Sequence, residues 1–144
     1  MLHDVVPDPR ASAAEQLHAH ATRLGRIVDA AGIDACAQAA DLPPSTVADL
    51  ADGDVETAAD LDLEAVAAIH ALEPDAPDPA VVLADAREAL LLGMTTGILS
   101  VDEVASDVAV AVEPREVQAM LEGRQPMTLR TYVELSRVIA GLAR

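Results

Sequence analysis

The sequence predicts an all-α protein made of two tandem helical units. Apolar residues recur at the three- and four-residue spacing of helices, and no segment shows sustained alternation of apolar and polar residues. The apolar side chains are mostly Ala, Val and Leu, with a single aromatic residue, Tyr132. Such small side chains favour helices packed at close distance over a sandwich of bulky strands. A repeat of helix starts and stops predicts that there are two units.

The repeat has an offset of seventy residues. In each copy a proline is followed, at intervals of three, by an apolar residue, a second apolar residue and a glycine. The matched positions are Pro44, Val47, Leu50 and Gly53 in the first copy and Pro114, Val117, Met120 and Gly123 in the second. Apolar positions in the helix that follows also agree, at an offset of 66. Chance similarity between Ala-rich helices is the alternative, but it does not account for the matching starts and stops.

The segment "PDAPDP" separates the two copies. Its three prolines cannot continue a helix, so residues 74–79 are expected to form a stiff, extended linker. The chain of 144 residues is long enough for one ordinary domain or two very small ones. We therefore expect a first unit over residues 1–73 and a second over residues 80–144.

Helix boundaries in the first unit follow from caps and breakers. Asp8 is the expected N-cap of the first helix, Pro9 its first residue and Gly32 its stop. The second helix is expected to follow a cap at Asp34, and the fourth is expected to end before Pro74. The expected helices of the first unit span residues 9–31, 35–42, 44–52 and 60–73.

The second unit repeats this order. Asp78 is expected to cap a helix that runs to Gly93, where "GMTTG" breaks it. Ser100 with Glu103 is a capping-box pattern, in which each side chain satisfies a backbone N–H of the other residue. The remaining expected boundaries are a helix start at Pro114, its stop at Gly123 and an N-cap at Thr128.

The order of helix, tight turn, short helix, Gly and helix is that of a helix-turn-helix unit. The stretches "AAGIDACAQAADLPPSTVADLADGD" and "ILSVDEVASDVAVAVEPREVQAMLEGR" resemble the lambda-repressor/Cro-like family of DNA-binding domains. Together the two helix-turn-helix-like units would cover residues 15–142. The composition and architecture also resemble an uncharacterised family of halophilic archaeal proteins. Relative to the helix-turn-helix pattern, the usual turn Gly is Asp41 in one unit and Ala111 in the other.

The resemblance implies that the short third helix of a unit contacts DNA. In the first unit this helix carries Asp49 and Asp52 and no Arg, which makes it poorly suited to DNA. In the second unit Arg115 and Gln118 are the candidates for base contacts, because Arg and Gln form bidentate hydrogen bonds with guanine and adenine. Val117 and Met120 are expected to face the core. The candidates for contacts with the DNA backbone are Arg124, Arg130 and Arg137.

Charge is distributed unevenly along the chain. The net charge is −16, there is no Lys, and residues 113–144 carry +1 while residues 1–112 carry −17. A phosphate-binding surface, if present, is therefore expected in the C-terminal part. The acidic, Lys-free composition predicts a protein adapted to molar salt, where the Debye length is only about 3 Å.

The sequence is compatible with two functions. The first is a DNA-associated regulatory protein of a halophilic archaeon, and the alternative is a protein-protein interaction adaptor that uses the same scaffold without binding DNA. A homodimer is also possible. There is no nucleophile–base pair, glycine-rich phosphate loop or cofactor fingerprint, so we expect no enzyme, no cofactor and no small-molecule ligand.

Membrane, metal and redox roles are not expected. No apolar run reaches the roughly 20 residues of a membrane span, and the N-terminus lacks the pattern of a secretory signal, so a cytoplasmic location is expected. His18 and His20 lie two residues apart and are expected on a solvated helix surface rather than in a metal site. The lone Cys36 is expected to be a buried small apolar residue.

The composition generates a prediction about salt. Folding should require high ionic strength, because the repulsion of a −16 charge must be screened around a core of small side chains. Dialysis to low salt should remove helical circular dichroism or lower the melting temperature. An unchanged melting temperature between about 0.1 M and 2 M KCl, where screening lengths differ about fourfold, would contradict this.

Overall fold

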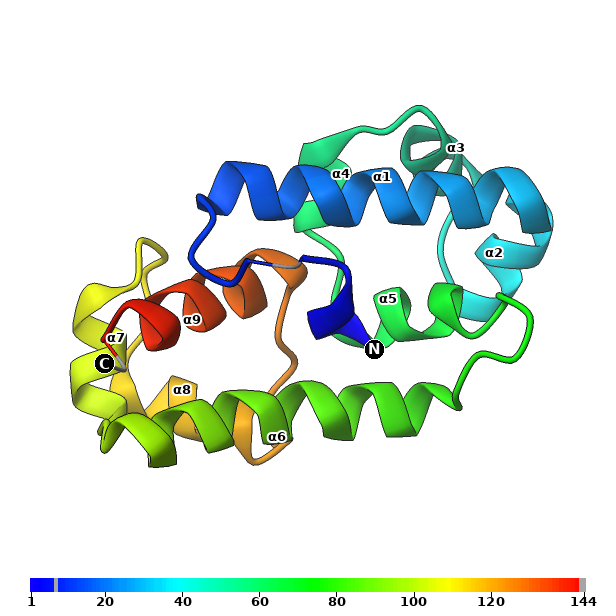
Figure 1. Ribbon diagram of the computed structural model, residues 1–144. Helices are drawn as coiled ribbons and strands as arrows, with labels where there is room; N and C mark the ends of the chain where they lie inside the picture. Colours follow the sequence, from blue (N-terminus) through cyan, green and yellow to red (C-terminus); the bar gives the residue numbers. More distant parts are fainter. Residues whose placement is uncertain (7, 143–144) are drawn as a thin grey trace.

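The computed structural model describes residues 1–6 and 8–142 and is all-α (Figure 1), which confirms the predicted fold class. In this part of the chain a short 3-10 helix, η1, precedes nine α-helices. Their bounds are η1 Leu2–Asp4, α1 Ala13–Ala31, α2 Ile33–Ala40, α3 Pro44–Ala51, α4 Val55–Ala59, α5 Leu63–His70, α6 Pro79–Gly97, α7 Val101–Asp107, α8 Pro114–Leu121 and α9 Leu129–Leu142.

Several expected caps are present. Ser100 and Glu103 form the capping box of α7, and the Asp78 side chain accepts a hydrogen bond from the backbone of Ala80 at the start of α6. The Thr128 hydroxyl accepts from the backbone N–H of Thr131 at the start of α9. Capping by short polar side chains therefore set these helix starts, as the sequence indicated.

The expected start of the first helix at Pro9 is wrong. The helix begins at Ala13, and its cap is Ser12, whose side chain accepts a hydrogen bond of 3.1 Å from the backbone N–H of Glu15. Gln16 explains the difference, because its buried side-chain amide donates to the carbonyls of Pro9 and Ala11 and holds that stretch outside the helix. The expected stop at Gly32 is confirmed.

The expected end at Gly93 of the helix that begins after Asp78 is also wrong. Helix α6 continues through "GMTTG" to Gly97. Gly93 lies where the helix packs against α9, and a Cβ atom there would come within 2.7 Å of the Ile139 side chain. This glycine therefore serves close helix packing and does not break the helix. The helix ends instead at Gly97, and the next residue, Ile98, is its C-cap and adopts a left-handed backbone conformation.

Three further features differ from expectation. A short helix, α4, occupies a stretch where none was predicted, because Asp54 caps it by accepting from the backbone of Thr57. The helix expected over residues 60–73 is shorter and consists of α5, Leu63–His70. The second helix begins at Ile33, directly after Gly32, rather than after a cap at Asp34.

The two long helices, α1 and α6, lie on opposite sides of the molecule, with α5 and α9 between them (Figure 1). Contacts between the two halves of the chain are extensive, because α5 packs on α6 and α1 packs on α9. The buried side chains form one continuous apolar core that includes Leu24, Leu50, Ile69, Leu129 and Leu135. The halves therefore share a core, and the division into two helix-turn-helix-like units at residues 74–79 stays a prediction.

A short antiparallel bridge joins the halves where α5 and α9 begin. The backbone N–H of Leu63 donates to the carbonyl of Met127, and that of Leu129 donates to the carbonyl of Leu61, both at 2.8 Å. Leu61 and Met127 lie 66 positions apart, as do Leu63 and Leu129. Each of the two hydrogen bonds, donated by one half, therefore has its counterpart donated by the other half. In the same way, the packing of α5 on α6 corresponds to the packing of α9 on α1.

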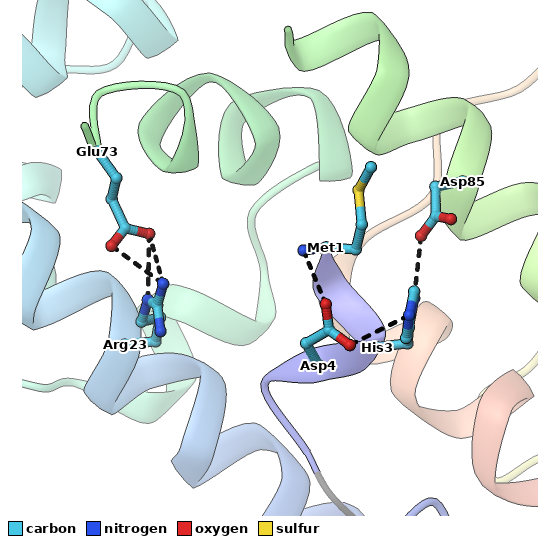
Figure 2. A network of polar contacts seen from close by, with 6 residues as sticks. All are labelled: Met1, His3, Asp4, Arg23, Glu73 and Asp85. Carbon is cyan, nitrogen blue, oxygen red and sulfur yellow. Dashed lines mark hydrogen bonds and ion pairs between the residues drawn. The ribbon is translucent and has the colours of Figure 1, made fainter. Parts of the chain in front are cut away.

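The N-terminal residues cross the space between α1 and α6 (Figure 1). Leu2 is fully buried, and His3 contacts Asp85 of α6 at 2.9 Å (Figure 2). In the same view Arg23 of α1 forms a bidentate pair with Glu73, which follows α5. The His3–Asp85 contact therefore connects the first residues to the second half, whereas the Arg23–Glu73 pair lies within the first half.

Two histidines are buried in this region. The expectation that His20 lies on a solvated surface is wrong, whereas His18 is exposed. Burial, followed by the nearby His70, lowers the pKa of His20 to about 4. Burial also lowers the pKa of His70 to about 4, against the opposing effect of Glu73. The His20 ring packs edge-on against Tyr132, with ring centroids 6.4 Å apart. Cys36 is buried, as expected.

The buried histidines predict loss of stability in acid. Because the folded-state pKa values lie below 6.5, the unfolded chain binds protons that the folded chain excludes as the pH falls from about 6.5 to about 4. Each histidine should remove roughly 3 kcal/mol of unfolding free energy over that range and contribute no pH dependence above it. Denaturant unfolding at several pH values in 2 M KCl measures the slope of the unfolding free energy against pH.

Matched variants isolate the contribution of the histidines from that of the carboxylates. His20→Gln and His70→Gln should each flatten the slope, whereas His18→Gln, at the exposed position, should leave it unchanged. Equal slopes in the wild type and in both buried-site variants would contradict the prediction.

Candidate nucleic-acid interface

Helix α8 carries the two candidates for base contacts. It begins at Pro114 and is amphipathic, with Val117 and Met120 buried as expected. Arg115 and Gln118 point away from the core, and the Arg115 side chain is 84% exposed. The helix therefore presents both side chains to solvent, where another molecule can reach them.

Each candidate on or beside α8 is bound to a carboxylate of the same chain. The Arg115 guanidinium lies 2.9 Å from Glu113, and the Gln118 amide donates to Glu122 at 2.7 Å. Arg124 donates to the other oxygen of Glu122 at 2.9 Å. The hydrogen bond from Gln118, followed by that from Arg124, lowers the pKa of Glu122 below its usual value. Gln118 and Arg124 thus converge on one acidic side chain.

The two candidates on α9 are also paired with carboxylates. Arg130 reaches across to the first half of the chain, where it lies 2.7 Å from Glu56 and 3.6 Å from Asp60. Arg137 lies 3.2 Å from Glu134, which is buried and also accepts a hydrogen bond from the backbone N–H of Ala109. Carboxylates of the first half therefore engage Arg130, and a carboxylate of its own helix engages Arg137.

The turns before α3 and α8 differ. Helices α2 and α3 are joined by three residues, 41–43, and Asp41 has left-handed torsion angles, φ 54° and ψ 50°. That length is typical of a helix-turn-helix motif. Helices α7 and α8 are joined by the longer segment 108–113, whose residues lack positive φ angles. The tight turn thus precedes the acidic helix α3, where Asp49 and Asp52 are exposed.

One further arginine lies close to this site. Arg87 of α6 packs against Gly123, where a Cβ atom would lie 3.0 Å from the guanidinium carbon. Arg87 and Arg124 line a hollow of about 210 Å³ together with Glu64 and Met127. The sequence offered no signal for Arg87, because it lies on a helix 36 positions before Gly123 and outside the repeated motif.

In residues 1–6 and 8–142 no three His, Cys, Asp or Glu side chains are placed to hold a metal ion. No single helix within these ranges has the length and hydropathy to cross a membrane, although α6 and α7 together meet both criteria across a bend of 105°.

Residues 17–142 match a family model described as a family of unknown function, DUF5791. The chain belongs to this family. The match runs through both halves and includes every helix from α1 to α9 at least in part. No curated protein and no solved structure matches the chain. Membership in DUF5791 supplies no activity.

Proposed function

We propose that the protein is a protein-interaction module that uses its helical scaffold without contacting DNA. The observation that carries this proposal is the pairing of the candidate DNA contacts. Arg115, Gln118 and Arg124 are each bound to a carboxylate beside α8, and Arg130 is bound to the first half of the chain. Arg137 is likewise bound to Glu134.

The charges around α8 support this function. Residues 113–124 carry three Glu and two Arg, so the exposed helix is slightly acidic. A phosphate brought to Arg115 would also approach Glu113. Repulsion between like charges 4 Å apart is about 1 kcal/mol in bulk water and larger near a protein surface. Molar salt screens this repulsion, but it equally removes most of the counterion-release gain that drives proteins onto DNA.

The outward position of Arg115 and Gln118 supports a second candidate function, a DNA-associated regulatory protein. Exposed ion pairs contribute about 0–1 kcal/mol, so Glu113 could release Arg115 to a base at little cost. In that case α8 would lie in the major groove, where a bidentate contact from Arg115 discriminates between bases by about 1–3 kcal/mol. This second function requires the protein to bind some duplex DNA sequences more tightly than others.

A selection experiment separates the two functions. The wild-type protein is mixed in 2 M KCl with a pool of random duplex DNA, and retained duplexes are sequenced. The proposed function predicts no enriched sequence. An enriched sequence that binds the wild type and is lost on Arg115→Ala would overturn the proposal in favour of the DNA-associated regulator.

The carboxylates provide a matched control. Glu113→Gln with Glu122→Gln removes two negative charges and keeps side chains of similar shape. If these charges exclude DNA, the double variant should bind duplex DNA at about 0.5 M KCl without sequence preference, and the wild type should not. Circular dichroism at the same salt concentration shows that both proteins are folded.

A further inference from the structure

The outer side of α6 carries an exposed stripe with little charge. Its positions alternate by three and four residues, the spacing by which one helix packs along another. All are exposed, and they are Val81, Ala84, Glu88, Leu91, Thr95 and Ile98. Leu92, beside the stripe, is 67% exposed, and Ile98 is 89% exposed. The helix lies at one edge of the molecule, so this side is uncovered (Figure 1).

The first half of the chain offers an internal comparison. Helices α1 and α6 have the same length, and each residue of α6 corresponds to the residue of α1 that lies 66 positions earlier. The exposed α1 residues at the matching positions are polar. They are Glu15, His18, Arg26 and Asp29, in place of Val81, Ala84, Leu92 and Thr95. Leu91 gives no such comparison, because its counterpart Gly25 is buried against α3. The scaffold does tolerate charged side chains at the counterparts of Val81 and Leu92, so these two exposed apolar side chains need another reason.

The backbone of Ile98 also indicates that this side of α6 has a role beyond folding. It has a positive φ of 54°, and the corresponding residue in the first half is Gly32, with a φ of 96°. A β-branched residue is strained in this region, whereas glycine is not. Ile98 therefore combines backbone strain with an exposed apolar side chain. Neither property stabilises the isolated chain, and such strain is typical of functional positions.

We propose that the α6 stripe is the interface of an antiparallel homodimer, in which α6 packs against α6 of a second copy. This inference rests on the proposed function, because it names one partner of the interaction module. In a two-fold arrangement every contact occurs twice. The spacing places Val81 opposite Ile98 of the second copy and Ala84 opposite Thr95. Large side chains then meet large ones, and small meet small.

Charge determines which surface a second copy can use. Two chains of −16 repel each other over most of their surfaces, and residues 89–101 form the longest stretch without Asp, Glu, Lys or Arg. Glu88 is the single charged residue of the stripe. In the antiparallel arrangement it lies opposite Leu91, close to Glu88 of the second copy. The dimer should therefore strengthen with salt and with neutralisation of Glu88.

Sedimentation equilibrium of the full chain in 2 M KCl tests the proposal. The wild type should dimerise in the micromolar range, and Leu92→Arg and Ile98→Gly, which copy the first-half residues Arg26 and Gly32, should weaken dimerisation at least tenfold. Glu88→Gln should strengthen it. Ile98→Gly also relieves the backbone strain, so its melting temperature should not fall at concentrations where both proteins are monomeric. Ile98→Gly therefore tests the dimer interface even if Leu92→Arg misfolds.

Ile33→Ser is the matched control, because Ile33 is an exposed apolar residue outside the stripe. It should dimerise as the wild type does. A wild type that stays monomeric at about 0.5 mM, or a dimer that Leu92→Arg and Ile98→Gly leave unchanged, would overturn the inference. Either result would leave the proposed function standing, whereas sequence-selective DNA binding would overturn the proposed function whether or not the chain dimerises.

Discussion

The fold depends on the pairing of the two halves at the starts of α5 and α9. The first N–H groups of a helix have no partner within the helix and need one elsewhere. The Asp62 side chain does not cap α5; instead the N–H of Leu63 donates to the carbonyl of Met127, and the N–H of Leu129 donates to the carbonyl of Leu61. Each half therefore completes a helix of the other. Around this bridge, α5 packs on α6 and α9 packs on α1, so neither half can bury its apolar face alone.

This arrangement determines which surfaces are available for binding. Because α5 and α9 lie at the centre, the exposed helical surfaces lie on the other helices, among them the outer faces of α3, α6 and α8. They differ in charge, since α3 presents Asp49, α8 has Glu113, Glu116 and Glu122 on or beside it, and the C-terminal part of α6 is uncharged. Apolar surface that the fold does not require is a better indication of a protein partner than of a nucleic acid. This contrast supports the proposed protein-interaction function.

The sequence predicted the fold class and many helix ends, because local effects set them. Ser100, Asp78 and Thr128 cap helices by hydrogen bonds to residues two or three positions away, and the burial of Val117 and Met120 follows from helical spacing. Features that depend on distant contacts were missed. Gly93 looked like a breaker because its packing against Ile139 is invisible in a local pattern, and His20 looked solvated because Tyr132 lies far along the chain. The exposure of Arg115 was predictable from spacing, but the pairing of Arg130 with Glu56 was not.

Native-state hydrogen exchange in 2 M KCl tests the central claim, that the two halves form one cooperative core. The decisive amides are those of Leu63 and Leu129, which donate across the bridge. If the halves depend on each other, both amides should exchange only through global unfolding, with the same free energy as the most protected amides of α1 and α6. A partial opening that exposes Leu129 and the amides of α6 and α9, while those of α1 and α5 stay protected by several kcal/mol more, would contradict the account.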